Sequence, residues 1–349
     1  MTTSVLIVDD AAAVRRALVY ALGIHPDIEV AGTAVDGRDA ITAIEVRNPD
    51  VVLLDLMMPV LDGIGALEII RRRWPALPVV VFSTASTRGS LAATQALVAG
   101  AVAALPKPMA ATPDEVVALV HGEIVPLLLA VSRRDRPAAE TVTPELRAPQ
   151  STGRPDLLVI GASTGGPFAL AQLLADLGRV DIPVMVTQHM PIGFTEPLAR
   201  HLSMRTGLDV AEAFDGAPLR SGSVRIAPGG RHLLVAGGRD GLVTRLTDTA
   251  PVHHCRPAVD PLFMSAARVV GSAVLGVVLT GMGSDGADGA GHIVTAGGEV
   301  LAQDAATSVV WGMPGAVATA GHASEILPIE ELGSAVRRRI VRTPAPAAS

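Results

Sequence analysis

The sequence predicts two α/β domains, each built on a doubly wound parallel sheet, and three observations lead to that prediction. Short runs of Val, Ile and Leu alternate along the chain with longer segments whose apolar residues recur at helical spacing. Aromatic residues make up only 2% of the chain, which suits helices packed on parallel strands better than a β-sandwich. The 349 residues suffice for two domains of about 100–200 residues each, and a patternless stretch separates two regions of alternation.

The first region, residues 1–130, contains five strand candidates separated or followed by amphipathic helices. We expect helices at 11–22 and 38–47, and further helices around Leu67, Ala96 and Val117. The predicted strands are 5–8, 28–31, 51–54, 79–82 and 102–105. Five such units predict a doubly wound sheet whose functional site lies at the carboxyl ends of the strands.

Residues 131–155 are rich in Arg, Pro, Thr and Glu and show no periodicity, so we expect an exposed linker there. A second α/β domain is predicted at 156–342, and the tail 343–349 is expected to be disordered. Its strand candidates are 157–160, 183–187, 224–227, 233–236, 242–245, 274–279 and 299–302.

Composition and charge exclude several classes of protein. The formal net charge is −6, which argues against sequence-independent nucleic-acid binding because neutralising phosphates needs a basic surface. The single cysteine, Cys255, excludes an internal disulfide and a Cys-rich zinc site. The first residues lack the basic segment of a signal peptide, and no apolar run is long enough to span a bilayer. We therefore expect a soluble cytoplasmic protein.

Polar residues follow four strands of the first predicted sheet. Asp9 and Asp10 come after the first strand and Asp55 after the third, so three carboxylates converge at one edge. Clustered carboxylates repel one another unless a hard divalent cation such as Mg²⁺ neutralises them. Ser83 ends the fourth strand and Lys107 the fifth, and both side chains are expected in the same crevice. Lys107 is the only lysine among 28 basic residues, which marks a place where arginine does not substitute.

This pattern resembles the receiver domain of bacterial response regulators over about residues 3–125. The matching motifs are VDD at 8–10, DLMMP at 55–59, DG at 62–63, FST at 82–84 and PKP at 106–108. The resemblance implies a flavodoxin-like fold with strand order 2-1-3-4-5. It also implies that Asp55 accepts a phosphoryl group from a histidine kinase.

The same resemblance implies a role for each residue of the crevice. Mg²⁺ would be held by Asp9, Asp10, Asp55 and the backbone of Met57. Ser83 and Lys107 would bind the phosphoryl group, with Thr84 as the rival to Ser83. Ala104 departs from the family pattern, which usually has an aromatic residue three positions before the lysine. An aromatic switch at that position is therefore not expected to transmit the signal.

The second domain opens with GASTGGP at 161–167, directly after its first strand. Flanking glycines allow a tight turn that presents the Ser163 hydroxyl at the start of a helix. Backbone N–H groups of Thr164 or Gly165 would then lie where a developing oxyanion is stabilised. The rival reading, a phosphate- or dinucleotide-binding loop, is disfavoured because neither the G-x-G-x-x-G nor the P-loop spacing is present.

A base and an orienting carboxylate can be found at other strand ends. His189 follows the apolar strand 183–187, from which only Gln188 separates it. Asp285 lies in the turn after strand 274–279. Such a carboxylate could orient the imidazole and stabilise its charged form. The chain order Ser–His–Asp differs from the Ser–Asp–His order of α/β-hydrolases and disfavours that family. His253, His254 and Cys255 are adjacent and cannot readily share one ion, so we expect no metal site there.

The second domain as a whole resembles the catalytic domain of the chemotaxis protein-glutamate methylesterase family, CheB, over about residues 155–340. The matching motifs are GASTGGP at 161–167, QHMP at 188–191, GFT at 193–195, APGG at 227–230, RPAVDPLF at 256–263, LTGMGSDGA at 279–287 and GMPGAV at 312–317. The resemblance implies a catalytic triad of Ser163, His189 and Asp285 that needs no cofactor. It adds the backbone N–H of Met282 as a second oxyanion donor.

The implied reaction is hydrolysis of glutamate methyl esters on chemoreceptors, regulated by phosphorylation of the receiver. The implied partners are a chemotaxis histidine kinase and methylated chemoreceptors, with neither nucleic-acid binding nor membrane insertion. Deamidation of receptor glutamines by the same triad stays open. Two alternatives also stay open: a response regulator whose second domain performs no chemistry, acting outside chemotaxis, and a serine hydrolase of small-molecule esters.

Overall fold

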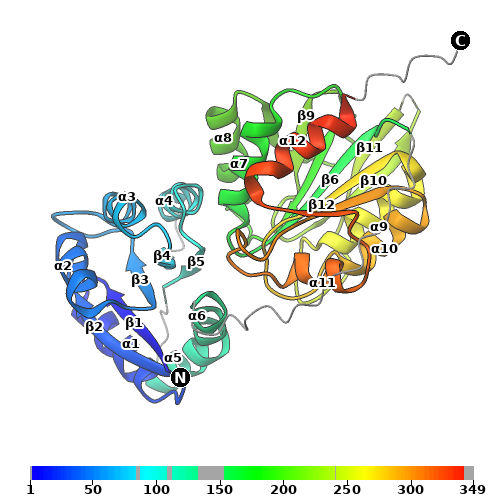
Figure 1. The fold of residues 1–349 in the computed structure, drawn as a ribbon. Helices are drawn as coiled ribbons and strands as arrows, with labels where there is room; N and C mark the ends of the chain where they lie inside the picture. The colour runs from blue at the N-terminus through cyan, green and yellow to red at the C-terminus, as the bar shows by residue number, and fades with distance from the viewer. Residues whose placement is uncertain (1, 84–86, 108–111, 133–152, 240, 342–349) are drawn as a thin grey trace, which may run out of the picture. The chain divides into compact units, whose positions relative to one another are not determined.

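A computed structural model describes residues 2–83, 87–107, 112–132, 153–239 and 241–341. The chain divides into two compact units, residues 1–140 and 141–349, which are coloured from blue to cyan and from green to red in Figure 1. Most of the predicted linker 131–155 and the predicted tail 343–349 lie outside the described residues, so the expected domain boundaries stay predictions. None of the described helices is both long and apolar enough to cross a bilayer.

The N-terminal unit is a five-stranded parallel sheet in the order β2-β1-β3-β4-β5, which confirms the predicted doubly wound receiver topology. Its strands are β1 (Thr3–Val8), β2 (Ile28–Ala34), β3 (Val51–Asp55), β4 (Val79–Ser83) and β5 (Ala103–Pro106). Its helices are α1 (Ala12–Gly23), α2 (Gly37–Arg47), α3 (Gly63–Arg73), α4 (Thr87–Val98), α5 (Pro113–Leu119) and α6 (Val125–Val131), with a π-helical turn at Val120–Ile124 joining the last two. The helix expected around Val117 thus continues to Val131.

Local sequence explains where several of these helices begin. Asp36 precedes α2 and its carboxylate accepts hydrogen bonds from the backbone N–H groups of Arg38 and Asp39. Thr112 and Glu115 form a capping box at the start of α5. These side chains satisfy N–H groups that have no partner within the helix. These caps therefore fix where α2 and α5 begin, after the loops that follow β2 and β5.

The C-terminal unit is a seven-stranded parallel sheet in the order β14-β13-β12-β6-β7-β9-β8. Its strands are β6 (Leu157–Ala162), β7 (Val184–Gln188), β8 (Asp209–Glu212), β9 (Ser223–Ile226), β12 (Val274–Val278), β13 (Glu299–Gln303) and β14 (Glu325–Leu327). The helices are α7 (Gly166–Leu177), α8 (Thr195–Thr206), α9 (Val259–Val270), α10 (Ala287–Thr295), α11 (Met313–Thr319) and α12 (Ile329–Ile340). The parallel α/β class expected for this unit is confirmed. The two edge strands, β8 and β14, were not predicted.

Two of the predicted strands are not part of this sheet. Residues 233–236 and 242–245 fall in β10 (His232–Gly238) and β11 (Gly241–Thr247), which form a separate antiparallel hairpin. Buried side chains of the hairpin, Leu233 and Val235, join the same core cluster as Leu262 and Phe263 of α9. The hairpin therefore packs on a helix and extends the core of the unit.

The order of strands places the candidate site at the middle of the sheet. β6 comes first in the sequence of this unit, and β12 and β7 pair with it on opposite sides. The connection after β6 leads to β7, and the connection after β12 leads to β13 in the opposite direction. A crevice is expected at the carboxyl ends of the strands at such a switch point. Ser163 follows β6, His189 follows β7, and Asp285 lies on the loop after β12.

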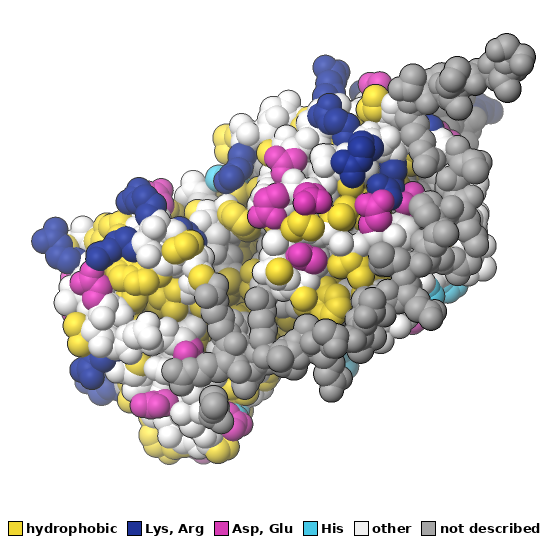
Figure 2. Space-filling view, viewed as in Figure 1, with side chains coloured by type: hydrophobic (Ala, Val, Ile, Leu, Met, Phe, Trp, Pro, Cys, Tyr) yellow, Lys and Arg dark blue, Asp and Glu magenta, His cyan; other side chains and the backbone are white. Residues whose placement is uncertain are grey.

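A buried ionic cluster fastens α12 to the edge of this sheet. The Arg339 guanidinium donates to Glu299 Oε1 at 2.7 Å and to Glu325 Oε1 at 2.8 Å, and its side chain is only 10% exposed. These hydrogen bonds raise the pKa of Arg339, although burial acts in the opposite direction. The neighbouring surface is mixed in charge: Figure 2 shows acidic and basic side chains side by side on the visible face of this unit.

We expect Arg339→Ala to lower the free energy of unfolding of the C-terminal unit by about 3–5 kcal/mol, because Glu299 would stay buried without its partner. The neighbouring Arg338, whose only described hydrogen bond is an exposed one to Ser334, is the matched control. Arg338→Ala should change stability by no more than about 0.5 kcal/mol. Urea unfolding of the two variants checks the difference. Equal midpoints would show that the ionic cluster contributes nothing to stability.

Candidate active site and phosphoryl-acceptor site

Asp55, the last residue of β3, lies in a buried acidic crevice of the N-terminal unit. The Lys107 ammonium donates to Asp55 Oδ2 at 2.6 Å, and the Met57 N–H donates to Asp55 Oδ1 at 3.2 Å. Burial raises the pKa of Asp55, while the hydrogen bond from Lys107 acts to lower it. The pKa of Lys107 is raised, because the hydrogen bond to Asp55 and the negative charge of Asp9 outweigh the effect of burial. The lysine therefore supplies a permanent positive charge beside the carboxylate.

The crevice has the donor set that a hard divalent cation requires. One carboxylate oxygen from each of Asp9, Asp10 and Asp55 lies within 4.8 Å of the others. Lys107 Nζ is 2.9 Å from Asp9 Oδ2, an ion pair without hydrogen-bond geometry, so this buried oxygen has no hydrogen bond among the described residues. Three carboxylates, one of which has a buried oxygen without a hydrogen bond, fit Mg²⁺, because this ion binds through few carboxylates and keeps several waters.

The other predicted residues of this crevice are only partly described. Ser83 ends β4 and pairs with Pro106 of β5, but its side chain lies outside what the structure describes. Thr84 also lies outside the described residues, so the choice between the two hydroxyls stays a prediction. Ala104 is half-buried in the middle of β5.

In the C-terminal unit, Ser163 occupies the turn between β6 and α7. Gly166 N–H donates to the Ser163 carbonyl at 2.8 Å, and Gly165 adopts a φ of +76° that an L side chain rarely takes. A Cβ on Gly281 would lie 2.7 Å from the Ser163 Cβ, so the absence of a side chain lets the loop after β12 reach the serine. Gly165 of the GASTGGP motif and Gly281 of the LTGMGSDGA motif are thus required because a side chain would not fit at either position.

His189 and Asp285, which the sequence predicted as base and orienting acid, lie together. His189 Nε2 is 2.7 Å from Asp285 Oδ2, and the two side chains are 11% and 2% exposed. Burial acts to lower the pKa of His189, but the Asp285 hydrogen bond and the nearby Cys255 thiol raise it to about 9. In the described part of the chain no hydrogen bond joins the Ser163 hydroxyl to His189. Such contacts often tighten only when substrate binds.

Backbone amides at the start of α9 hold the Asp285 carboxylate. Val259 N–H donates to Oδ2 at 2.6 Å and Asp260 N–H donates to Oδ1 at 3.0 Å. Burial opposes ionisation, yet the His189 hydrogen bond and these amides lower the pKa of Asp285. The partial positive charge at a helix N-terminus favours this ionised form. The imidazole therefore faces a carboxylate that stays charged.

Three residues that the sequence analysis did not single out as functional contact this group. The Gln188 side-chain amide donates to the backbone carbonyls of Ser163 at 2.9 Å and His189 at 3.2 Å, joining the two loops. Cys255 contributes to the raised pKa of His189. Asp260, inside the RPAVDPLF motif, is buried next to Asp285. An isolated acid in an apolar segment is the one sequence signal that could have indicated Asp260.

The predicted oxyanion donors have backbone N–H groups available. Among the described residues, the N–H groups of Thr164, Gly165 and Met282 make no hydrogen bond within the chain. Thr164 is instead held through its carbonyl, which accepts from the Thr280 hydroxyl at 2.9 Å. Three amides without partners beside Ser163 can receive a developing negative charge.

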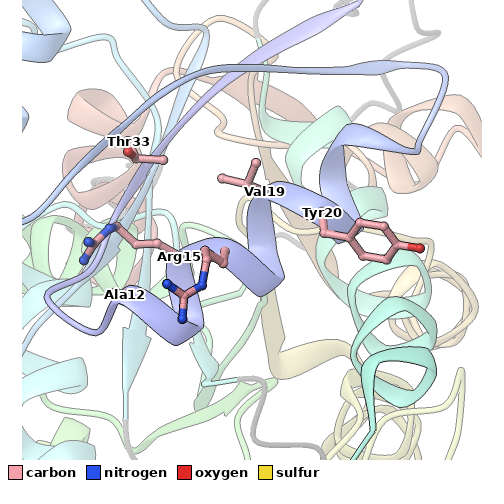
Figure 3. Close-up of a pocket in the computed structure, with 6 residues that line it drawn as sticks. Ala12, Arg15, Val19, Tyr20 and Thr33 are labelled. Carbon is pink, nitrogen blue, oxygen red and sulfur yellow. The ribbon is translucent and has the colours of Figure 1, made fainter.

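A surface pocket of about 510 Å³ lies elsewhere, on the N-terminal unit. Figure 3 shows its lining, which comes from one side of α1 and from Thr33 of β2. Arg15 of this pocket also donates to the Asp9 carbonyl at 2.5 Å, which ties α1 to the loop of the acidic crevice. The lining contains none of the candidate site residues, and we assign the pocket no part in the chemistry.

Comparisons with known proteins agree with this geometry. The family described as CheB methylesterase matches residues 158–336, and the response regulator receiver domain family matches residues 5–121. A protein-glutamate methylesterase/protein-glutamine glutaminase of Nocardioides sp. is 48% identical, over 97% of this chain and 95% of that protein. A protein of the same name, of the group 2 operon of Rhodospirillum centenum, is 40% identical over 98% of this chain and 95% of its own length.

The solved structures include a relative of the C-terminal unit. The Thermotoga maritima CheB methylesterase catalytic domain is 38% identical and has a TM-score of 0.52, covering 53% of this chain and 99% of that one. The chain therefore belongs to the CheB methylesterase family and carries a response regulator receiver domain ahead of its catalytic domain.

Proposed function

We propose that the chain is a protein-glutamate methylesterase that hydrolyses glutamate methyl esters on chemoreceptors, under control of its receiver domain. The observation that carries the proposal is the buried His189–Asp285 pair, which lies at the carboxyl ends of the central strands, as does the Ser163 turn. In a non-catalytic domain, no function would be served by burying a charged carboxylate, Asp285, against the His189 imidazole. The curated relatives are named for the ester reaction, which disfavours a hydrolase of small molecules.

In the first half of the reaction, the Ser163 oxygen attacks the ester carbonyl carbon. His189 accepts the serine proton on Nδ1, because Nε2 faces Asp285. The carbonyl oxygen becomes an oxyanion, which the N–H groups of Thr164, Gly165 and Met282 would stabilise. The C–O bond to the methoxy group then breaks, and the proton on His189 leaves with methanol.

In the second half of the reaction, water replaces the serine as the nucleophile and attacks the acyl-enzyme. His189 takes a proton from water, the hydroxide attacks the acyl carbon, and the bond to the Ser163 oxygen breaks. The serine recovers its proton from His189, and the glutamate side chain is released as a carboxylic acid, which then gives its proton to water. The same steps applied to a glutamine side chain release ammonia in place of methanol. We extend the proposal to this deamidation, since the relatives carry the glutaminase name as well.

The receiver supplies the regulation. Asp55 accepts a phosphoryl group from a histidine kinase, and Lys107 then neutralises an oxygen of that group. Asp9, Asp10 and Asp55 would hold Mg²⁺, which shields negative charge during phosphoryl transfer when it is bound. Unphosphorylated receiver restrains the esterase, and phosphorylation releases it. The kinase and the receptors' methylated segments are both cytoplasmic partners, and we place the enzyme in that compartment.

The decisive experiment replaces Ser163. Ser163→Ala should lower methanol release from methyl-labelled receptor membranes to the rate without enzyme, because no acyl-enzyme can form. Ser284→Ala, on the exposed loop next to Asp285, is the control and should retain activity. Methylesterase activity in Ser163→Ala equal to that of the unaltered chain would overturn the proposed triad.

The pKa of His189 predicts the pH dependence. A base acts only when neutral, so kcat/KM should rise about tenfold per pH unit above pH 7 and level off near the pKa of about 9. Asp285→Asn should shift this rise to lower pH, because it removes the hydrogen bond that raises the pKa of His189, and should also lower the plateau. Ser163→Ala measured at each pH corrects for spontaneous ester hydrolysis. A flat profile from pH 7 to 9 would contradict the raised pKa.

Lys107→Arg tests the regulation. We expect this variant to fold and to accept phosphate from acetyl phosphate, yet to show much weaker activation of the esterase. A guanidinium is too broad for a crevice in which Nζ contacts two carboxylates. Residues 150–349 alone should be active without acetyl phosphate. Full activation in Lys107→Arg, or equal rates of the full chain and residues 150–349 without acetyl phosphate, would contradict the scheme.

A further inference from the structure

A tight turn at residues 252–255 lies beside the proposed triad: Cys255 acts on the pKa of His189, and His253 contacts Asp260, the acid next to Asp285. Val252 and Cys255 exchange backbone hydrogen bonds of 3.1 and 2.8 Å, and the two residues between them, His253 and His254, have φ values of +49° and +62°. Positive φ at both central positions is the geometry of a type I′ turn, which non-glycine residues adopt at a cost in backbone strain. The strain is maintained by contacts at the turn, and His253 makes one of them.

His253 is paired with a carboxylate that borders the triad. Its Nε2 lies 3.0 Å from Asp260 Oδ2, and the Asp260 side chain is 3% exposed whereas that of His253 is 40% exposed. The other oxygen of Asp260, Oδ1, accepts from the N–H groups of Gly286 at 3.0 Å and Gly289 at 2.7 Å. His253 is therefore the side-chain partner of Asp260 on its solvent side.

Backbone N–H groups link the loops that carry Asp260 and Asp285. The Asp260 N–H donates to the Asp285 carboxylate, and Asp260 in turn accepts from Gly286, the residue after Asp285. The charge of one carboxylate acts on the other, so the first proton goes to one of the two. Burial and the Asp285 charge raise the pKa of Asp260, whereas the pKa of Asp285 is lowered. Asp260 is thus the acid that takes a proton first.

A protonated Asp260 would harm the triad. Its O–H could donate to the Asp285 carboxylate and so weaken the hydrogen bond between that carboxylate and His189. The hydrogen bond from His253 favours the ionised form of Asp260 and so prevents this competition. We propose that His253 is a positioning residue of the esterase, which acts through Asp260 to keep Asp285 available as the acceptor for His189. The inference rests on the proposed function of the triad.

Other titratable groups lie close to this pair. An oxygen of Asp288, on α10, lies within 4.8 Å of the facing atoms of His253 and Asp260. Cys255 and His254 belong to the same turn, and His189 and Asp285 lie on the inner side of Asp260. Assays in EDTA ensure that no divalent ion bridges His253, Asp260 and Asp288 during the measurement. Asp288 adds negative charge, which favours a hydrogen-bond donor at position 253.

The test compares three substitutions in the full-length chain. His253→Ala removes the donor, and His253→Gln keeps an N–H near the position of Nε2 without an ionisable ring. His254→Ala is the matched control, because His254 is exposed, also has a positive φ, and makes no hydrogen bond among the described residues. For each variant, kcat and KM for methanol release from methyl-labelled receptor membranes are measured from pH 6 to 10.

We expect His253→Ala to lower kcat about tenfold with KM within about twofold, a loss typical of a misplaced reacting group. The rise of kcat/KM with pH should move to lower pH, because the Asp285 hydrogen bond that raises the pKa of His189 is weakened. His253→Gln should recover at least half of the lost kcat, and His254→Ala should behave as the unaltered chain.

The outcomes separate this inference from the proposed function. Loss of activity in Ser163→Ala together with an unchanged kcat and pH profile in His253→Ala would overturn the inference and leave the triad standing. Equal losses in His253→Ala and His254→Ala would assign the effect to the turn backbone and also overturn the inference. If Ser163→Ala remains active, the proposed triad itself fails.

Discussion

The catalytic half of the molecule depends on one electrostatic arrangement, a buried carboxylate held by the N-terminus of a helix. Asp285 would be costly to ionise in its buried position, but the N–H groups of Val259 and Asp260 compensate for the lost water. Asp260 is held in the same way by Gly286 and Gly289 at the start of α10. The two helices and the loop after β12 are therefore fixed by the same hydrogen bonds that fix the charge. Stability and catalysis share these contacts, and neither can be altered alone.

The two units solve the same problem of buried negative charge in different ways. Both collect carboxylates at the carboxyl ends of parallel strands, where the topology leaves a crevice. In the receiver, a mobile cation and the Lys107 ammonium would share the neutralisation, so the net charge of the crevice can change when Asp55 is phosphorylated. In the esterase unit, fixed backbone dipoles and His189 neutralise Asp285. A regulated site suits the first arrangement, and a site that must keep one geometry through many turnovers suits the second.

The resemblance to receiver domains predicted the strand order of the first unit, and short apolar runs such as 51–54 and 274–278 predicted most of the strands. The sequence pattern missed β8 and β14, since short edge strands carry few apolar residues. The hairpin β10–β11 looked like two more strands of the main sheet, because apolar runs do not reveal their partners. Ser163, His189 and Asp285 were found by their positions after strands. Asp260 and His253 act through backbone amides and a turn with positive φ, and neither leaves a pattern in side-chain spacing.

The single lysine shows how far residue chemistry can be inferred from composition. A chain that uses arginine at its other 27 basic positions has kept an ammonium at position 107. There Nζ lies 2.6 Å from Asp55 Oδ2 and 2.9 Å from Asp9 Oδ2, with 11% of the side chain exposed. A guanidinium has five N–H donors in a rigid plane, and a crevice of this size cannot satisfy all of them. An ammonium concentrates its charge on one atom and can follow Asp55 Oδ2 to a phosphoryl oxygen by rotation of its flexible stem. Since Ala104 offers no aromatic ring to move, this ammonium is the group in the crevice best able to register that Asp55 has changed.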